Sequence, residues 1–493
     1  MSKNFTAKTR VSMRAALEER KPQRLNEQVL SRFGIRQVEI VSTRDLRPSS
    51  RNARTHSKAQ IQQIAQSIAA FGFTNPIIAD ASNRIVAGHG RHSAALALGL
   101  KRVPVIRLEG LSPLELRAYA LADNRLAEKA GWDDELLALE LQELSALDLD
   151  FSIETTGFEI PEIDQLIAKL DERGGQKEID QAAEICPSIN HTLPTVSAGG
   201  DIWILSEHRL AVGDVRDAAL IERLMVGSKA AAVVTDPPYN VRIPGFASGK
   251  GKAKHKDFAM ASGEMTPPEY ADFLQRCLGI MAANVMHGSY LAVFIDWRHI
   301  APLVVVAESL DLQLRNICVW VKAQGGMGSL YRSQHELLAL FSTGTPARNN
   351  IQLGRFGRNR TNVWHYPGPN SLRPEGRAEL AAHPTVKPVA MIADAILDLT
   401  ARGDIVLDPF AGSGTIFVAA EKTGRRAYGV EIDTGYADVC IKRWQQYTGR
   451  EARLSETGET YEQVMRRRTG RSETPSGRST APSQPRTGKR GRK

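Results

Sequence analysis

The spacing of apolar residues divides the chain into segments of different structure. Apolar residues recur every three or four positions over 57–72 and 91–99, which predicts two amphipathic helices. Short apolar runs around these helices predict strands, at 36–43, 75–80, 84–88 and 103–108. We therefore expect a compact α/β domain over 37–130, preceded by a polar N-terminal arm over 1–36.

Helical spacing continues after this domain and then stops. Residues 112–170 are rich in leucine, as in DELLALELQELSAL, and the pattern breaks near residue 171. We expect a helical region and a linker over 131–195.

The longest part of the chain alternates apolar strands with amphipathic helices. Apolar runs predict strands at 201–205, 208–214, 231–236, 289–296, 314–323, 336–343, 404–410 and 425–433. Helical patterns at 267–285 and 388–401 lie between several of them. This alternation predicts a mostly parallel sheet with helices on both faces, an α/β domain over 196–450.

Length and composition agree with this division. A chain of 493 residues is too long for one core, and 42% hydrophobic and 24% charged residues are ordinary for a globular protein. The chain contains no run of about 18 apolar residues, so no membrane span is predicted and we expect no membrane partner. The four cysteines are scattered without a CxxC pair, which argues against a metal site and favours a cytoplasmic protein with free thiols.

The net charge of +9 lies in the C-terminal end of the chain. Residues 466–493 contain ten Lys and Arg against the single acid Glu473, so residues 1–465 sum to zero. The end of the chain is also rich in Ser, Thr, Pro and Gly, which predicts a basic disordered tail over 451–493. Such a tail raises affinity for nucleic acid without reading its sequence; a solvated tail with no dedicated partner is the alternative.

The segment DIVLDPFAGSGTIFVAA (404–420) is an apolar strand, a glycine-rich turn and a helix. Such a turn lets the backbone approach a ligand closely. Its spacing is neither GxGxxG nor that of a Walker loop. The next strand ends at Glu431, where an acid suits ribose hydroxyls. On these residues alone, a dinucleotide site or a purely structural turn stays open.

A second apolar strand ends in Asp236-Pro237-Pro238-Tyr239. Together with the glycine-rich turn, this segment resembles the β group of amino DNA methyltransferases, which use S-adenosylmethionine. The resemblance covers roughly 200–447 and rests on short motifs in the order of that permuted group: VGD, TDPPYN, VWVK, HELLALFSTG, NVW, HPTVKP, DPFAGSGT and GVEID.

The resemblance implies a permuted Rossmann-like methyltransferase fold and assigns residues to the cofactor. The methionine end would be held by Asp408, Phe410, Gly412, Ser413, Gly414 and Thr415. Glu431 would take the ribose, and Asp214, Thr385 and Lys387 would lie nearby. Ile416 departs from the pattern, where a second Thr is common.

The Asp-Pro-Pro-Tyr segment suits methylation of an exocyclic amine, which is a poor nucleophile because its lone pair is delocalised into the base. Asp236 and the Pro237 carbonyl can accept the two N–H bonds, while Pro237 and Pro238 fix the backbone. Tyr239 can stack on a base that has been flipped out of the duplex. A turn that merely ends the strand is the bland alternative.

Two basic segments of this domain are candidate contacts to double-stranded DNA. A glycine-rich stretch carries Lys250, Lys252, Lys254 and Lys256. A second stretch, at the place of the family's target-recognition segment, carries Arg348, Arg355, Arg358 and Arg360. A solvated loop and an ordinary arginine-rich surface are the alternatives.

The first domain contains IVAGHGRHSAALALG (85–99), in which a glycine turn again opens a helix. With RPSSRNART and FGFTNPIIAD it resembles the ParB/sulfiredoxin-like superfamily over about 37–125. The family's G-x-x-R segment, which binds nucleotide phosphates or DNA, is matched by Gly88 and Arg91. His89 stands where a sulfiredoxin needs Cys, so we expect no sulfur chemistry. His89 and His92 are candidate metal ligands, but a phosphate contact or simple placement at the helix start is favoured over a metal site. We expect a binding module rather than an enzyme; hydrolysis of CTP, cleavage of DNA and an inert remnant of the fold are the alternatives.

These observations predict a ParB-like module joined to a methyltransferase that acts on N6 of adenine in DNA. We call the Asp236-Pro237-Pro238-Tyr239 segment the clamp. Asp at its first position favours adenine, because N4-cytosine enzymes of this group more often begin with Ser. N4-cytosine, RNA, and a ParB-like partition factor with a degenerate methyltransferase are the alternatives. A homodimer is a further expectation, and a piece from about 190 to 450 is expected to work alone.

Overall fold

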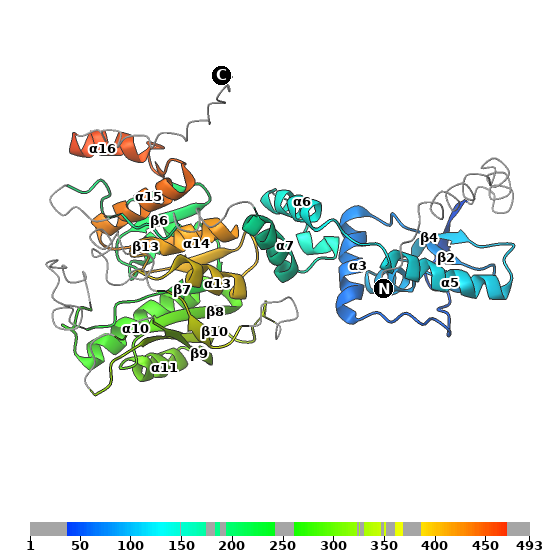
Figure 1. Cartoon of the computed structure of the whole chain (residues 1–493), viewed down its shortest axis with the longest axis horizontal. Coiled ribbons are helices and arrows are strands. Elements are labelled where there is room, and N and C mark those ends of the chain that lie inside the picture. Colours follow the sequence, from blue (N-terminus) through cyan, green and yellow to red (C-terminus); the bar gives the residue numbers. More distant parts are fainter. Residues whose placement is uncertain are drawn as a thin grey trace, which may run out of the picture. The chain divides into compact units, whose positions relative to one another are not determined.

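A computed structural model of the chain describes residues 37–147, 149–173, 183–187, 194–241, 261–322, 325, 330–346, 350–351, 360–367 and 386–470. It divides into two compact units, Met1–Glu159 and Ile160–Lys493, and each is described by itself (Figure 1). Within the ranges just given, no helix is both long and apolar enough to cross a membrane.

The first unit contains a small mixed sheet in the order β1-β4-β2-β3. Its strands are β1 (Val38–Ser42), β2 (Ile77–Ala79), β3 (Ile85–Ala87) and β4 (Arg102–Arg107). β4 pairs antiparallel with β1 and parallel with β2, and β3 pairs antiparallel with β2. Ile77, Ile85 and Val105 are fully buried and form the centre of the core. The strands therefore match the predicted α/β domain.

The helices of this unit include the two predicted over 57–72 and 91–99, the second of which begins two residues earlier than predicted. They are α3 (Lys58–Phe71), α4 (His89–Ala97), α5 (Pro113–Glu128) and α6 (Asp134–Ala146), with a short 3-10 turn at Ile153–Thr156. The Ser57 hydroxyl accepts the Gln60 amide and starts α3, and Gly72 ends it. Gly88, with φ of 92°, precedes α4 and adopts the left-handed conformation that glycine tolerates best.

The second unit is built on a sheet in the order β11-β9-β10-β8-β7-β12-β13-β6-β5-β14. Its strands are β5 (Ile202–Leu205), β6 (His208–Val212), β7 (Ala230–Thr235), β8 (Val285–Ile295), β9 (Gln313–Val321), β10 (His335–Ser342), β11 (Val363–His365), β12 (Ile405–Asp408), β13 (Arg426–Glu431) and β14 (Arg453–Leu454). Its helices are α7 (Ile160–Arg173), α9 (Ala218–Met225), α10 (Pro267–Ala283), α11 (Ile300–Ser309), α13 (Val389–Leu399), α14 (Thr415–Thr423), α15 (Thr434–Thr448) and α16 (Tyr461–Thr469).

Five of the nine neighbouring strand pairs described for this sheet are parallel, so the sheet is mostly parallel as predicted, with antiparallel pairs added to it. A parallel block β8-β7-β12-β13-β6 lies at its centre. On both sides of the block, antiparallel pairs extend it: β10 and β9 beyond β8, and β5 and β14 beyond β6. The reason is local, because β5 and β6 are joined by only Ser206 and Glu207, and a two-residue turn joins only antiparallel strands.

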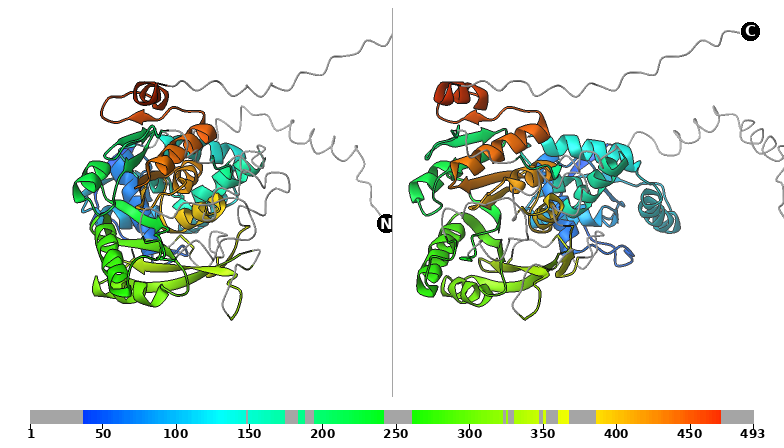
Figure 2. Two further views of the ribbon diagram at one scale, coloured as in Figure 1. Left: turned by 90° about the vertical axis from the view of Figure 1, so that its left-hand side faces the viewer. Right: turned by 60° about the vertical axis from the view of Figure 1, so that its left-hand side comes forward.

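Helices cover both faces of this sheet (Figures 1 and 2). Successive residues of β7 point to opposite faces: Ala232 and Val234 belong to the core with α13, α14 and α15, and Val233 belongs to the core with α9, α10 and α11. A strand buried on both faces is apolar throughout, which explains the uninterrupted apolar runs of the sequence.

The predicted disordered tail over 451–493 is wrong for residues 451–470. β14 pairs with β5, and α16 buries Tyr461, Val464 and Met465. Arg468 forms a two-point ion pair with Asp201, at 2.5 and 2.9 Å. Residues 471–493 lie outside the described residues.

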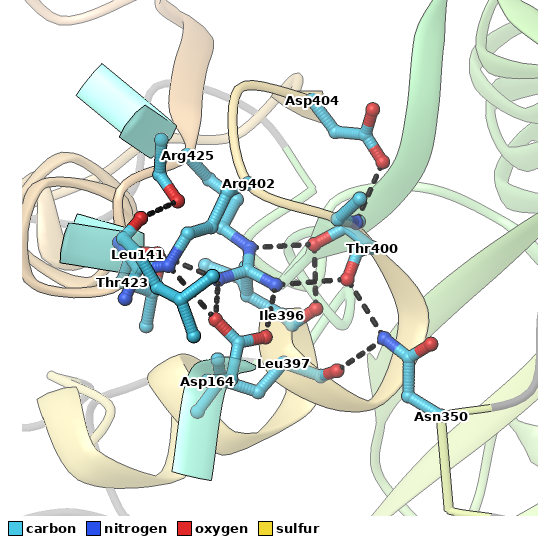
Figure 3. A network of polar contacts seen from close by, with 12 residues as sticks. Leu141, Asp164, Asn350, Ile396, Leu397, Thr400, Arg402, Asp404, Thr423 and Arg425 are labelled. Atoms are coloured by element: carbon cyan, nitrogen blue, oxygen red, sulfur yellow. Dashed lines mark hydrogen bonds and ion pairs between the residues drawn. The ribbon is translucent and has the colours of Figure 1, made fainter. Parts of the chain in front are cut away.

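Helix α7 is fixed to the second unit by a buried charge network (Figure 3). The Asp164 carboxylate accepts hydrogen bonds from both terminal nitrogens of Arg425, at 2.9 and 2.7 Å. It also pairs with Arg402, whose Nε lies 3.1 Å from Asp164 Oδ1. Arg425 also donates to the Thr400 carbonyl at 2.9 Å. This two-point geometry is the strong form of an Arg–carboxylate pair, so α7 belongs structurally to the large sheet.

Candidate active site

The three acids that the sequence places after strands lie at one edge of the sheet. Asp236 follows β7, Asp408 ends β12 and Glu431 ends β13, and these strands are parallel neighbours. Carboxyl ends of parallel strands meet at the same edge, where open α/β sheets bind their ligands. The Thr235 hydroxyl donates to Asp408 Oδ1 at 2.7 Å, so the clamp strand and the cofactor strand are directly joined.

The glycine-rich turn after β12 is held against Glu431. Glu431 accepts the Gly412 amide and the Asp433 amide, both at 2.8 Å. Asp408 accepts the Phe410 amide at 3.1 Å. Gly414 has φ of 77°, and a Cβ there would come within 2.9 Å of the Cys440 backbone. A larger residue would therefore push α15 away from the turn.

A buried arginine that the sequence analysis did not single out also holds this turn. Arg443, on α15, donates to the Ser413 carbonyl at 3.3 Å and to the Thr415 hydroxyl at 2.9 Å. It also donates to the carbonyl of Ala183 at 3.2 Å. Nothing in the sequence pattern distinguishes Arg443 from the surface arginines, because its role depends on tertiary packing.

The acids at this edge suit a ligand with positive charge and hydroxyl groups. Burial raises the pKa of Asp408 to about 7 and that of Glu431 to about 8, although neutral donors bind both carboxylates. A cation or hydroxyl near these buried carboxylates would stabilise their ionised forms. The sulfonium, amino and ribose groups of S-adenosylmethionine have this chemistry, so the residues present fit the cofactor.

The Asp-Pro-Pro-Tyr segment forms a closed set of hydrogen bonds. Asp236 Oδ2 receives the Lys387 ammonium, and Asp236 Oδ1 receives the Tyr239 hydroxyl. The Tyr270 hydroxyl, from α10, donates to the Pro238 carbonyl at 3.0 Å. Asn240 has φ of 53°, and its side chain ties the following loop through the Gly263 and Met265 amides. The segment is thus rigid, with Asp236 and Tyr239 directed toward each other.

Lys387 reaches the clamp, whereas the sequence analysis placed it near the cofactor. Its ammonium lies between Asp236 and Glu336, and its distance to Glu336 Oε2 is 3.2 Å. Glu336 also pairs with Lys322. The sequence analysis missed Glu336, although a charged residue near the start of an apolar strand was a usable signal.

The remaining cofactor candidates lie partly outside the described residues. Thr385 is outside them. Asp214 lies just past the end of β6 at the same sheet edge, where it pairs with Arg216. The pKa of Asp214 is lowered mainly by its hydrogen bond with this arginine.

Most of the predicted DNA contacts also lie outside the described residues: Lys250, Lys252, Lys254, Lys256, Arg348, Arg355 and Arg358. Arg360 is described, and its guanidinium contacts protein groups. It pairs with Asp398 at 2.6 Å and Asp394 at 3.2 Å and lies over the Trp364 ring. These contacts with acids and an aromatic ring stabilise the fold, and a DNA contact by Arg360 stays a prediction.

In the first unit, the G-x-x-R segment forms the predicted turn and helix start. A Cβ on Gly88 would lie 3.1 Å from the Arg91 guanidinium, so this arginine folds back over the turn. The ring of His89 accepts the Ser49 amide at 3.2 Å, and the buried His92 bonds the Thr43 carbonyl at 3.0 Å. Both histidines thus have protein partners. No group of three metal-ligating side chains occurs within the described part of the chain.

Comparison with protein families finds matches to three parts of the chain. Residues 28–125 match the ParB N-terminal domain, 135–191 match the ParB-methyltransferase HTH domain, and 230–442 match the DNA methylase family of N6 and N4 methyltransferases. The sequence analysis expected the middle region to be helical, and did not identify the HTH domain.

Individual relatives match the two ends of the chain separately. The type II methyltransferase M.HpaI of Haemophilus parainfluenzae is 26% identical over 43% of this chain and 67% of its own length. The ParB-like nuclease domain-containing protein YnaK of Escherichia coli is 50% identical over 14% of this chain and 78% of its own length. Among solved structures, an M1.HpyAVI–SAM complex is 20% identical, covers 48% of this chain and 97% of its own, and gives a TM-score of 0.35.

Proposed function

Because the chain belongs to the N6/N4 DNA methylases and carries ParB-type domains ahead of its methylase domain, we propose that it methylates N6 of adenine in double-stranded DNA. As a member of this family it is a DNA amino-methyltransferase that depends on S-adenosylmethionine and modifies adenine or cytosine. The choice of adenine, and the roles of individual residues, are our proposal.

One observation carries the proposal: the clamp and the cofactor turn are in direct contact. The hydrogen bond from Thr235 to Asp408 joins the residue before Asp236 to the strand end that opens the glycine-rich turn. An amine held at Asp236 and a ligand held at Asp408 and Glu431 would therefore lie beside each other. Fixing two reactants in this way supplies much of a transfer reaction's acceleration.

In the proposed reaction the main task of the protein is to position the target amine beside the methyl donor. When bound, S-adenosylmethionine supplies a sulfonium methyl group with its own leaving group. Asp236 accepts an N–H of the target amine and orients its lone pair, and the neighbouring proline carbonyl is the second acceptor. Tyr239 lies within hydrogen-bond reach of Asp236, where its ring can stack on the flipped base.

Adenine is favoured over cytosine by Asp at the first clamp position. The N4-cytosine reaction is the second candidate, because it needs the same acceptors on a smaller ring. RNA as substrate, and a partition factor with an inactive methylase domain, are further alternatives. The direct contact between the clamp and the cofactor turn argues against an inactive methylase domain.

The test is Asp236→Ala, with product nucleosides identified by mass spectrometry. Removing one preorganised acceptor is expected to slow single-turnover methyl transfer about a hundredfold or more. Binding of S-adenosylmethionine should change little, because Asp408, Glu431 and the turn are untouched. The wild-type product is expected to be N6-methyladenine.

Asp272→Ala is a matched control, because Asp272 is an exposed acid on α10 of the same domain. Near-normal transfer by folded Asp236→Ala protein would show that the segment is only a turn. N4-methylcytosine as the product would overturn the choice of base and leave the clamp in place. Tyr239→Ala should slow transfer more than Tyr239→Phe, which retains the ring face.

For the first unit we propose a binding role. Gly88 and Arg91 form a turn and helix start that suit a phosphate of a nucleotide or of DNA. The proposed homodimer stays a prediction.

A further inference from the structure

Four charged residues form an alternating line that ends at the clamp. Lys322 is one-third exposed and pairs with Glu336, Glu336 lies 3.2 Å from Lys387, and Lys387 pairs with Asp236. The Lys387 side chain is only 7% exposed, and that of Glu336 is 17% exposed. Burying an ammonium group is costly unless carboxylates compensate it, so this geometry requires both acids.

Besides its two acids, Lys387 contacts β8 and the start of α14. Its ammonium lies 5.0 Å from the centre of the Phe294 ring, on β8. Its backbone carbonyl receives the Thr415 hydroxyl at 3.4 Å, beside the cofactor turn. Glu336 pairs in register with Trp320 on the neighbouring strand β9. The line of charges therefore connects the outer strands, the cofactor turn and the clamp.

The charges of this line act in opposite directions on Asp236. Burial raises the pKa of Asp236, Lys387 opposes that rise, and Glu336 adds to it. Lys387 and Lys322 hold the pKa of Glu336 at about 2 despite its burial. Among the described residues, the other ionisable groups that face the clamp include Tyr239, Tyr270, Asp296 and Asp408. A protonated Asp236 would have one oxygen occupied by hydrogen and would be a weak acceptor.

We propose that Lys387 and Glu336 are positioning residues: Lys387 keeps Asp236 ionised and oriented to accept the target amine, while Glu336 holds the Lys387 ammonium in place and limits its effect on Asp236. Lys387 supplies the compensating charge on Asp236 Oδ2 and leaves Oδ1 for the amine, once the Tyr239 hydroxyl gives way. Glu336 shares the positive charge of Lys387, so Lys387 does not fully neutralise Asp236. This inference rests on the proposed methyl transfer at Asp236.

The test compares the pH dependence of single-turnover methyl transfer in Lys387→Met, Glu336→Gln and wild type, at saturating S-adenosylmethionine. In Lys387→Met, Asp236 is expected to hold its proton to higher pH. The rate should be low at neutral pH and recover in alkali, with its inflection raised by about one pH unit or more. In Glu336→Gln the inflection should move to lower pH. Lys387→Arg should retain most of the wild-type profile.

Lys229→Met is the matched control, because Lys229 lies just before β7, at the opposite end of the strand from Asp236. A purely structural role predicts slower transfer without any movement of the inflection. Equal inflections in wild type, Lys387→Met and Glu336→Gln would therefore overturn the inference. A wild-type protein that transfers no methyl group to DNA would instead contradict the proposed function.

A second feature of the same edge is independent of this line of charges. β8 runs parallel to β7, with Val293 opposite Thr235, so the residues after β8 emerge beside the clamp. Trp297 is 47% exposed there, and the Arg298 guanidinium lies 4.7 Å from the centre of its ring. A large exposed aromatic residue with a stacked cation is a typical surface for nucleic acid.

Asp296 anchors this pair and links it to the clamp. It accepts the Arg298 guanidinium at 3.1 Å and His299 Nδ1 at 2.6 Å. The His299 ring meets the edge of Tyr270 at 5.0 Å, and Tyr270 donates to the Pro238 carbonyl. The exposed indole is therefore linked to the clamp through contacts with Arg298, Asp296, His299 and Tyr270.

We infer that Trp297 and Arg298 form a DNA contact beside the clamp. The indole stacks on a nucleobase exposed by flipping of its neighbour, and the guanidinium faces a phosphate. Flipping breaks base stacking, and an aromatic platform restores part of it. This contact deepens the proposed function by naming a surface that meets the DNA.

The test measures binding of a duplex that carries 2-aminopurine at the target base. Trp297→Ala is expected to weaken binding about tenfold and to reduce the fluorescence rise on flipping, while Trp297→Phe retains most of both. Arg298→Ala should reduce the slope of log K against log salt by about one. Val305→Ala is the control, because Val305 is an exposed apolar residue on α11.

Unchanged DNA affinity and fluorescence in Trp297→Ala would overturn this contact. Cofactor binding, measured on the same preparations, should be equal in all variants. A protein whose DNA binding depends on Trp297 but which transfers no methyl group would contradict the proposed reaction and leave the contact standing.

Discussion

Asp236, Asp408 and Glu431 lie at the same sheet edge but face different groups. Asp236 has a buried lysine beside it, whereas Asp408 and Glu431 are bound by hydroxyl and amide donors. The protein itself therefore supplies the first acid with a compensating cation. No cation lies beside the other two in the hydrogen bonds described for them, which is consistent with the proposed division between the clamp and the cofactor subsite.

This difference predicts a pH-dependent affinity for the cofactor. The pKa of Glu431 is about 8 in the free protein, so binding to ribose hydroxyls favours the ionised form and releases a proton. Affinity for S-adenosylmethionine should rise about tenfold between pH 7 and 9. Glu431→Gln should bind more weakly and lose that part of the rise. Calorimetry on both proteins separates the contribution of Glu431 from titration of the ligand's own amino group. If affinity rises equally with pH in wild type and Glu431→Gln, Glu431 does not bind the ribose.

The same carboxylate predicts the opposite trend for the stability of the free protein. The pKa of Glu431 is raised from 4.5 to about 8, so the folded state holds a proton that the unfolded chain releases. Its contribution to the free energy of unfolding is fully present below about pH 4.5 and is lost as pH rises toward 8. Thermal unfolding without cofactor should show this decline, and Glu431→Gln should flatten it. A flat wild-type profile would argue against a buried, proton-holding Glu431.

At the residue scale, sequence reasoning found the groups that end strands and missed those that depend on packing. Asp236, Asp408 and Glu431 each follow an apolar run, so their positions at one edge could be predicted. Lys387 lies 151 positions from Asp236, and no local pattern indicates that they touch. Arg443 likewise gains its role only when α15 packs on the glycine-rich turn.

At the scale of elements, most strands and helices were predicted from apolar spacing, but the C-terminal end was not. Its charge suggested disorder, although Tyr461, Val464 and Met465 have helical spacing and Thr460 with Gln463 forms a capping box. The sheet's antiparallel additions were also missed, because pairing direction depends on connection length and contacts distant in sequence.

The folded end of the chain leads to a prediction about its arginines. Arg468→Ala leaves the buried Asp201 without its cation and should lower the free energy of unfolding by about 1–3 kcal/mol. Arg466→Ala, on the same helix, changes an exposed pair and is the control with little effect. Thermal unfolding measures both. Equal effects would show that α16 does not depend on the buried pair.

The charges beyond α16 should act differently. Residues 471–493 contain seven Lys and Arg against Glu473. Their deletion is expected to leave the unfolding temperature unchanged and to flatten the salt dependence of DNA binding, since counterion release scales with phosphate contacts. Binding titrations at several salt concentrations test this. An unchanged slope would mean that the tail does not contact DNA.

At the scale of the whole molecule, the family matches and the two compact units describe a modular chain. Arg91→Ala should therefore impair ligand binding by the first unit and leave methyl transfer on short duplexes nearly intact. Nucleotide or DNA binding to the variant, measured beside single-turnover transfer, checks this. Equal loss of both would contradict the separation.

The boundary of the methylase unit is the last prediction. A piece from about 190 to 450, expected from sequence to work alone, omits the Asp164–Arg425 pair, the Ala183 contact to Arg443 and the folded residues 451–470. Loss of Asp164 leaves the fully buried Arg425 without its carboxylate, which is strongly destabilising. We expect residues 160–470 to fold and bind S-adenosylmethionine, and residues 194–450 to unfold at lower temperature with weaker binding. Asp164→Asn in the full chain should reproduce part of the loss. If the shorter piece equals the longer in unfolding temperature and cofactor affinity, then α7 and α16 are appendages rather than parts of this unit.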